Sequence, residues 1–199
     1  IKVFLKKQFH QSLNIFNSFL KKKINIINPD ILNIHWINRS TISLNEINQL
    51  KCKILISLHD MWFLNSTQHY FLKNNNDKDF ISSYCFKKKK DLIKKKGVYF
   101  VAHNNWMFNK FRQLFPKYKS KIFLCNYYPI DLNNFKPRNK IELRIKYKIP
   151  LNKKIVLFSA QDVSDKRKGY KYFIDFVKKS KNNSNLLYLS IGKNFNKSN

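Results

Sequence analysis

One seven-residue segment, 54–60, most constrains the fold. It reads Ile-Leu-Ile-Ser-Leu-His-Asp, a short apolar run that stops on a histidine and a carboxylate. An apolar run of this length predicts a strand buried in a parallel sheet. In open α/β sheets, ligands bind beyond the carboxyl ends of the strands, so His59 and Asp60 are predicted to lie at a ligand site.

Predicted strands and helices alternate along the chain. The predicted strands cover residues 31–36, 53–59, 98–102, 121–125, 154–159 and 186–191. The predicted helices cover 8–23, a segment capped by Ser40 or Thr41 that runs to Leu50, and then 79–96, 105–115, 140–147 and 170–181. Strands separated by helices pair in parallel, so the pattern predicts an α/β fold with Rossmann-like parallel sheets.

The chain is predicted to hold two domains. Three prolines punctuate residues 127–152, which carry only one short helical pattern and are predicted to be a linker. Residues 1–126 then form an amino-terminal Rossmann-like domain, and residues 153–199 begin a second one. Between the second and third predicted strands, residues 61–78 form a long polar loop, and loops of that length are usually functional or mobile.

The charge is unbalanced, with 40 Lys and Arg against 11 Asp and Glu and a formal net charge of +29. This balance suggests a polyanionic partner. The basic residues are mostly lysines, and they accompany many Asn, Ile and Phe, a skew typical of an AT-rich genome. We therefore interpret most of the charge as solvated surface, including the lysine runs 87–90 and 94–96. A nucleic-acid-binding protein would need exposed aromatics interleaved with cations or a known module, and neither is found.

The cysteines and the hydropathy argue against disulfide-bonded, zinc-binding and membrane-spanning proteins. The three cysteines are odd in number, widely spaced and without a CxxC pattern, which argues against a disulfide scaffold or a zinc site and favours a reducing cytoplasm. No run approaches the 18 to 20 apolar residues of a membrane span. We therefore expect a cytoplasmic protein whose membrane contact, if any, is peripheral at the inner face.

Two sites have alternative interpretations on residues alone. His59 either binds a hydroxyl group or is a strand-end histidine satisfied by backbone, and Asp60 either orients His59, binds a hydroxyl or caps the next turn. Arg167 and Lys168 precede Gly169 and a predicted helix, so their cations and the helix N–H groups suit a diphosphate. The alternative is that these cations are solvated surface.

Several short motifs follow one another in order along residues 29–175: His35-Trp36, Leu58-His59-Asp60-Met61-Trp62, His69-Tyr70, Val101-Ala102, Asn126, Ile130-Asp131, Phe135-Lys136-Pro137 and Arg167-Lys168-Gly169. This order resembles the glycosyltransferase family 4 group of enzymes with the GT-B fold. The resemblance implies transfer of a sugar from a nucleotide-sugar donor to a glycan or lipid-linked acceptor in cell-surface polysaccharide or lipopolysaccharide assembly. It also implies two Rossmann-like domains, with no metal or other cofactor.

The resemblance assigns roles to individual residues. His59, with Asp60, is expected to line the sugar site, and Lys168, with Arg167, is expected to contact the donor diphosphate. The expected acceptor-side residues are His35, Trp36, Trp62, His69 and Tyr70. For the first two, packing beneath a helix is an equal alternative. His103 and Asn104 replace a small polar pair of the family and receive no role.

Two elements of the family pattern do not occur in these 199 residues. They are the Gly-rich loop of the first domain and the Glu-rich motif that holds the donor in the second. We therefore expect the chain to be a fragment of a longer enzyme or a remnant, and a noncatalytic carbohydrate-binding scaffold is the alternative function. The high positive charge would favour docking at an anionic membrane surface that carries lipid-linked acceptors.

Overall fold

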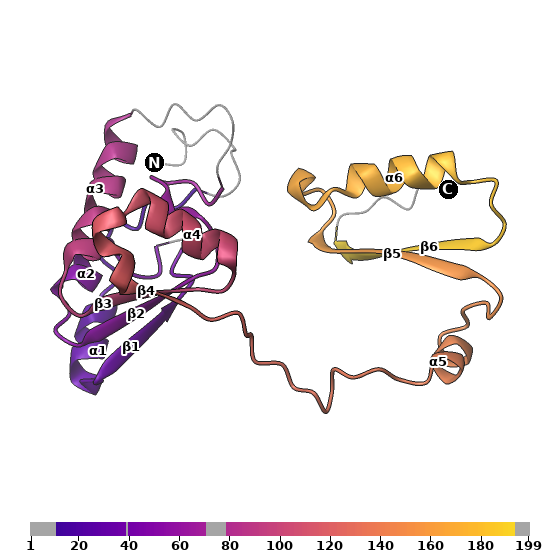
Figure 1. Cartoon of the computed structure of the whole chain (residues 1–199), viewed down its shortest axis with the longest axis horizontal. Helices are drawn as coiled ribbons and strands as arrows, with labels where there is room; N and C mark the ends of the chain where they lie inside the picture. The colour runs from indigo at the N-terminus through magenta and orange to yellow at the C-terminus, as the bar shows by residue number, and fades with distance from the viewer. Residues whose placement is uncertain (1–10, 39, 71–78, 194–199) are drawn as a thin grey trace. The chain divides into compact units, whose positions relative to one another are not determined.

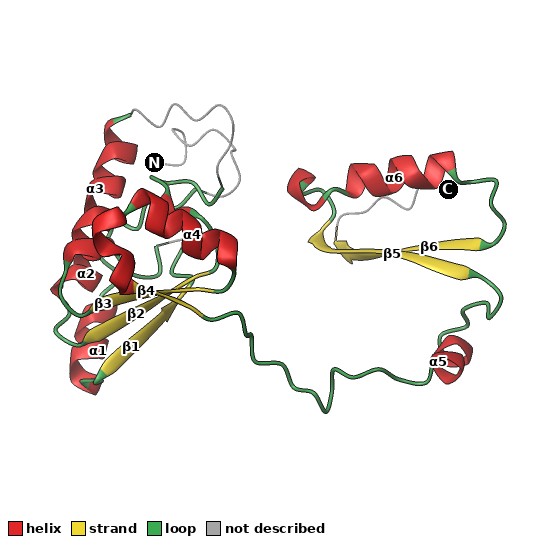
Figure 2. Cartoon of the chain, in the orientation of Figure 1, coloured by secondary structure: helices red, strands yellow, loops and turns green. Residues whose placement is uncertain are grey.

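The computed structural model describes residues 11–38, 40–70 and 79–193 (Figure 1). The chain divides into two compact units, Ile1–Pro129 and Ile130–Asn199. Each unit has parallel strands connected through helices, which confirms the predicted α/β class with a Rossmann-like sheet (Figure 2). None of the helices in the described ranges has both the length and the apolar composition needed to cross a membrane.

Unit 1 is built on a four-stranded parallel sheet of order β1-β2-β3-β4. Its strands are β1 (Ile31–His35), β2 (Lys53–Leu58), β3 (Val98–Ala102) and β4 (Ile122–Leu124). Its helices are α1 (Leu20–Ile27), α2 (Leu44–Gln49), α3 (Phe80–Lys94) and α4 (Asn105–Leu114), with the 3-10 segments η1 (Trp62–Leu64) and η2 (Pro116–Lys121). All four strands lie within the predicted ranges.

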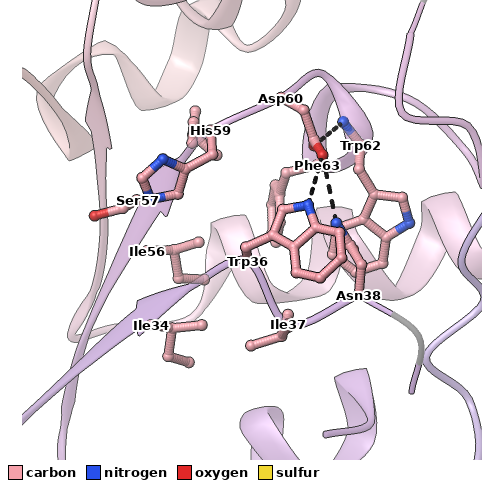
Figure 3. Close-up of a pocket in the computed structure, with 11 residues that line it drawn as sticks. Ile34, Trp36, Ile37, Asn38, Ile56, Ser57, His59, Asp60, Trp62 and Phe63 are labelled. Carbon is pink, nitrogen blue, oxygen red and sulfur yellow. Dashed lines mark hydrogen bonds between the residues drawn. The ribbon is translucent and has the colours of Figure 1, made fainter. Parts of the chain in front are cut away.

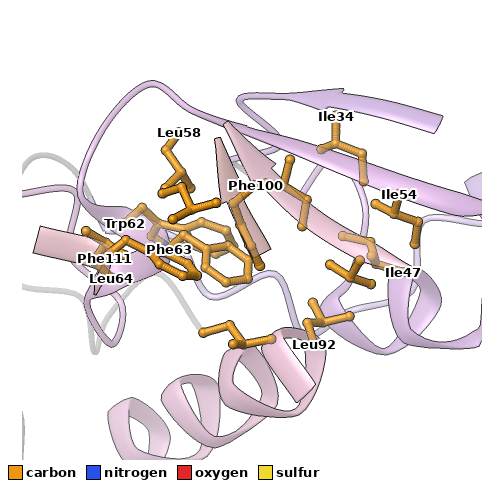
Figure 4. Close-up of a cluster of buried hydrophobic side chains, with 14 of the residues drawn as sticks. Ile34, Ile47, Ile54, Leu58, Trp62, Phe63, Leu64, Leu92, Phe100 and Phe111 are labelled. Atoms are coloured by element: carbon orange, nitrogen blue, oxygen red, sulfur yellow. The ribbon is translucent and has the colours of Figure 1, made fainter. Parts of the chain in front are cut away.

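The core of unit 1 lies against one face of this sheet (Figure 4). Alternate residues of β2 and β3 point into it and are buried, because successive side chains of a strand point to opposite faces. Phe100 is central, with its ring centre 4.9 Å from those of both Phe63 and Phe111. The core therefore joins the strands to η1 and to α4, and this packing fixes the ends of the strands where the predicted site lies.

The helix predicted over 8–23 is wrong for residues 11–19, which are not helical; residues 8–10 lie outside the described residues. The backbone of Asn14 is left-handed, with φ 51°. Its Nδ2 donates to the carbonyls of Ile37 and Ile42, at 2.6 and 2.8 Å. Asn tolerates the left-handed region better than most residues. The segment therefore binds the loop between β1 and α2 instead of forming a helical turn.

The predicted cap of α2 is also wrong, because Ser43 caps the helix rather than Ser40 or Thr41. Ser43 Oγ accepts from the backbone N–H of Glu46, and Glu46 accepts in return from the Ser43 N–H. This is a capping box, and its Ser-x-x-Glu spacing was readable from the sequence. Glu46 also accepts from the backbone N–H of Ser18 at 2.9 Å, so the same carboxylate holds the 11–19 segment.

The interpretation of the run 87–90 as a wet helix face is wrong for Lys89, which is fully buried. Its ammonium donates to three backbone carbonyls, those of Trp62 (2.5 Å), Asn65 (3.0 Å) and Ser66 (2.6 Å). Lys87 and Lys90 are exposed as predicted. One lysine of the run therefore fastens α3 to η1 and the turn after it.

Backbone carbonyls also bind other cations of the chain. Lys95 donates to two carbonyls at the end of α2, at 2.5 and 2.6 Å, and Lys121 donates to two at the end of α3, at 2.7 and 2.6 Å. Burial lowers the pKa of both lysines. Arg144 contacts three carbonyls in the turn before β5. In a chain with few carboxylates, these exposed ends of helices and turns serve as the acceptors.

Unit 2 contains a two-stranded parallel sheet, and its elements are α5 (Lys140–Lys146), β5 (Lys154–Asp162), η3 (Lys166–Lys168), α6 (Tyr170–Lys179) and β6 (Leu186–Lys193). Strand β5 runs three residues beyond its predicted end, through an irregularity in its register with β6. Phe158 packs on Tyr170 and Phe173, with ring centres 5.2 and 5.5 Å away. These contacts fix α6, and with it the loop that carries Lys168, against the sheet.

Candidate functional site

Three histidines lie at the carboxyl edge of the unit 1 sheet, one from each of three neighbouring strands. His35 is the last residue of β1, and His59 and His103 directly follow β2 and β3. Tyr128, four residues after β4, adds a fourth ring. The sequence prediction used His35 and His59 but gave His103 no role. Its position directly after a strand, like that of His59, was the available signal.

The three histidine rings form a row, and the Tyr128 ring packs beside His59 and His103. His35 Nδ1 and His59 Nε2 are 2.8 Å apart and share one hydrogen bond. The rings of His59 and His103 stack with centres 5.1 Å apart and 23° between their planes. The centre of Tyr128 lies 4.5 Å from that of His103. His35 and His59 are exposed, so the row opens to solvent.

The surroundings of His59 favour its neutral form. Burial is the largest cause of its lowered pKa, and the nearby imidazoles of His103 and His35 lower it further, whereas Asp60 opposes them. A neutral imidazole has one donor and one acceptor nitrogen, which suits a hydroxyl ligand.

A small pocket lies where β1 and β2 end (Figure 3). Isoleucines from both strands form its apolar floor, and Trp36, Asn38, His59 and Asp60 bring polar groups to it. The Trp36 side chain is half-exposed, at 50%. Its indole N–H donates to Asp60 Oδ2 at 3.2 Å, which fixes the ring orientation.

Asp60 caps the next turn, one of the roles open from its sequence. Its Oδ1 accepts from the backbone N–H of Trp62 at 2.9 Å. Its Oδ2 lies 2.6 Å from His69 Nδ1, so Asp60 orients His69 and not His59. In Figure 3 the His59 ring points away from Asp60.

Trp62 and His69 were expected to contact an acceptor from an exposed loop, but both are buried, at 3% and 4% exposure. The Trp62 indole N–H donates to the Ser12 carbonyl at 2.7 Å, and His69 Nε2 lies 3.0 Å from Ser12 Oγ. This burial corrects both residues to structural ones that hold the 11–19 segment. Tyr70 is half-buried with its ring 6.4 Å from His69, and residues 71–78 of the predicted loop lie outside the described residues.

The Ser12, His69 and Asp60 side chains follow one another in the order of a hydrolase triad. Ser12 is only 5% exposed, however, and its backbone N–H donates to the Thr67 carbonyl at 2.8 Å. A nucleophile must reach its substrate. The arrangement is therefore a buried link between segments of unit 1.

In unit 2, Arg167 and Lys168 lie in η3, directly before α6. Asp165 caps η3 and binds the Arg167 guanidinium, with Nη2 to Oδ2 at 2.5 Å and Nε to Oδ1 at 3.1 Å. The charge of Arg167 is thus already paired. Gly169 takes the left-handed φ of 79° that ends η3, and it caps α6 without a side chain, which leaves the first N–H groups of α6 open to an anion.

Across the described parts of the chain, no group of three or more His, Cys, Asp or Glu side chains is arranged to hold a metal ion.

Comparison with known proteins finds similarity among the solved structures. No protein-family model matches the chain. No curated protein matches it. The fold is similar to a glycosyltransferase from Rickettsia africae ESF-5, over 87% of this chain, with a TM-score of 0.47 and 16% sequence identity. The chain spans 49% of the length of that protein. At this level the similarity bears on the fold alone.

Proposed function

We propose that this chain belongs to a glycosyltransferase of the GT-B type, similar to family 4. It would transfer a sugar from a nucleotide-sugar donor to a glycan or lipid-linked acceptor in cell-surface polysaccharide synthesis. The observation that carries the proposal is His59, an exposed imidazole at the carboxyl end of β2, in the motif that most resembles the family. Ligands of open parallel sheets bind at that edge.

Unit 2 supports the donor side of the proposal. Lys168 would contact the donor diphosphate together with the open N–H groups of α6. This helix has ten residues, which is long enough for its dipole to attract an anion. Arg167 would contribute less, because Asp165 already neutralises it. This ranking agrees with the family resemblance, which favours Lys168.

The proposed reaction is attack of an acceptor hydroxyl on the anomeric carbon of the donor sugar. The bond from that carbon to the diphosphate oxygen breaks, and negative charge grows on the departing nucleoside diphosphate, which takes up the proton of the attacking hydroxyl. Lys168 and the α6 N–H groups would stabilise this charge. His59, as a neutral imidazole, would hold a sugar hydroxyl in place.

Trp36 and His35 would form the acceptor side in unit 1. Half of the indole surface of Trp36 is exposed, and a fixed indole face can stack on a sugar ring. The net charge of +29 supports a further proposal, that the protein docks at an anionic membrane surface where a lipid-linked acceptor would lie.

The test uses the product of the complete reading frame that contains these 199 residues. We expect it to bind one nucleotide-sugar from a panel of UDP-, GDP- and CMP-linked sugars, and to keep that binding in high salt. A polyanion binder would instead lose affinity steeply as salt rises, because its binding releases counterions. Absence of binding to every nucleotide-sugar, with tight salt-sensitive binding to single-stranded RNA, would reject the enzyme and support a nucleic-acid-binding protein.

A further inference from the structure

We infer that His35 and His103 are positioning residues that hold the His59 ring in one orientation, with Nε2 bound by His35 and Nδ1 presented to a substrate hydroxyl. The role of the hydroxyl ligand rests on the proposed function. The geometry of the row does not, so the two can be tested separately.

The stacking of His59 on His103 follows from the sheet. Leu58 and Ala102 are register partners in β2 and β3, so the next residue of each strand, a histidine in both cases, projects at the same level. Neighbouring strands lie about 4.8 Å apart. Two rings placed in register at one edge therefore stack at nearly that spacing, and their centres are 5.1 Å apart.

His103 is itself fixed. Its Nδ1 lies 3.2 Å from the carbonyl oxygen of Cys125. A carbonyl can only accept, so Nδ1 must carry the proton of this bond. The Tyr128 ring also packs on His103, at 4.5 Å with 30° between the planes, and its centre lies 6.2 Å from that of His59. His103 is thus a ring with one orientation, and it gives His59 a flat surface to lie on.

His35 fixes the other side of His59. Its Nδ1 faces His59 Nε2 at 2.8 Å, so this nitrogen of His59 is engaged. In the described part of the chain, His59 Nδ1 has no hydrogen-bond partner and is the atom left for a ligand. Stacking on His103 holds the plane of the ring, and the bond to His35 decides which nitrogen faces outward, because a ring turned over would lose that bond.

The same neighbours keep His59 uncharged. The groups that face it are His35 from β1, Asp60 from its own segment, His103 from β3 and Tyr128 after β4. Burial and the two imidazoles lower its pKa, and the Asp60 carboxylate opposes them without cancelling them. A neutral His59 both donates and accepts, as recognition of a hydroxyl requires.

The experiment is NMR of histidine side chains in the full chain labelled with ¹⁵N and ¹³C. We expect His59 in the wild type to show a single tautomer and a pKa below its ordinary 6.5. His35→Ala and His103→Ala should each raise that pKa and mix the tautomers. In His103→Asn the side-chain amide can still donate to the Cys125 carbonyl, but no ring is left to stack on His59. This variant should therefore fold normally and show the same His59 pKa and tautomers as His103→Ala.

Neighbouring tyrosines provide a matched control. Tyr128→Ala removes a ring that packs beside His103 and His59 and should disturb the signals of both histidines. Tyr127→Ala removes a tyrosine that is 84% exposed and should leave those signals unchanged. A pKa and tautomer of His59 that stay the same in both His35→Ala and His103→Ala would overturn the inference, whether or not the protein binds a nucleotide-sugar.

A second measurement connects the row to the ligand. In the product of the complete reading frame, we expect the nucleotide-sugar identified above to shift the His59 Nδ1 resonance more than its Nε2 resonance. The affinity should fall roughly tenfold in His103→Ala, a loss near 1.4 kcal/mol. A normal row in the free protein with no response to any nucleotide-sugar would leave the positioning intact and would reject the proposed function. A larger shift at Nε2 would overturn the assignment of Nδ1.

Discussion

The ammonium of Lys89 lies 3.7 Å from the ring centre of Trp62 and donates to the carbonyl oxygen of the same residue. Removing this buried cation takes a donor from three backbone carbonyls, of which that of Trp62 keeps the Asn65 N–H. Each unsatisfied buried polar group costs about 1–3 kcal/mol. We therefore expect Lys89→Met to lower the free energy of unfolding of unit 1 by about 3 kcal/mol. Urea unfolding followed by tryptophan fluorescence measures it, because all three tryptophans belong to unit 1.

Lys87→Met is the matched control on the same helix. Lys87 is exposed, so its loss should change the unfolding free energy by less than about 0.5 kcal/mol. Equal effects of the two substitutions would contradict the placement of Lys89 in the core.

Glu46 is a buried carboxylate that stabilises unit 1 through its charge. Burial raises its pKa, but bonds from Ser18, Ser43 and the backbone N–H of Lys21 outweigh burial and lower the pKa to about 2. A carboxylate whose pKa is lower in the folded state adds stability that is complete above its unfolded pKa, near 4.5, and is lost as pH falls toward 2. The contribution at neutral pH is about 3 kcal/mol.

We therefore expect Glu46→Gln to lose most of this stability at pH 7 and to flatten the fall in stability between pH 4.5 and pH 2. Fluorescence-detected urea unfolding at several pH values measures both effects. Glu142→Gln, at an exposed position of unit 2, should leave the curve of unit 1 as in the wild type. If the unfolding free energy of Glu46→Gln still falls between pH 4.5 and pH 2 as in the wild type, another group causes that fall.

Asp60 joins the pocket to the 11–19 segment, since it accepts from Trp36, from Trp62 and from His69. Asp60→Ala should free the Trp36 indole and loosen His69, with a loss of about 2–4 kcal/mol in the unfolding free energy. Acrylamide quenching of tryptophan fluorescence should increase in this variant. Asp91→Ala removes a half-exposed carboxylate 3.9 Å from Lys94 and serves as the control, with little change in either measurement.

The strands were predictable because each is a short apolar run, and the positions of His35 and His59 followed from where those runs stop. The conformation of the 11–19 segment could not be predicted, because its apolar residues fit a helical period. Its conformation depends on Asn14 and Ser18 meeting partners 28 residues away in the sequence. Nothing in a local pattern identifies such partners, and tertiary contacts override propensity there.

The burial of single charged and polar residues could not be predicted from the sequence either. Lys89 differs from its three lysine neighbours only by the face of α3 on which it lies, and Trp62 and His69 read as loop residues until η1 folds them inward. In contrast, the Ser43 and Glu46 capping box could have been predicted from its local spacing. The position of His103 after a strand could also have been predicted, but its stacking on His59 depends on the register between β2 and β3.

Lys168 and Lys178 lie at opposite ends of α6 and offer a sharp test of the donor site. Lys168 lies two residues before the helix begins, where its charge and the open N–H groups would act on the same anion, whereas Lys178 lies in the last turn. We expect Lys168→Ala to weaken nucleotide-sugar binding roughly 10- to 100-fold, the loss of one charge-assisted contact. Lys178→Ala removes the same charge and should change binding less than twofold. Calorimetry on the product of the complete reading frame measures both, and equal weakening would mean that only net charge matters and would exclude a diphosphate site at this helix end.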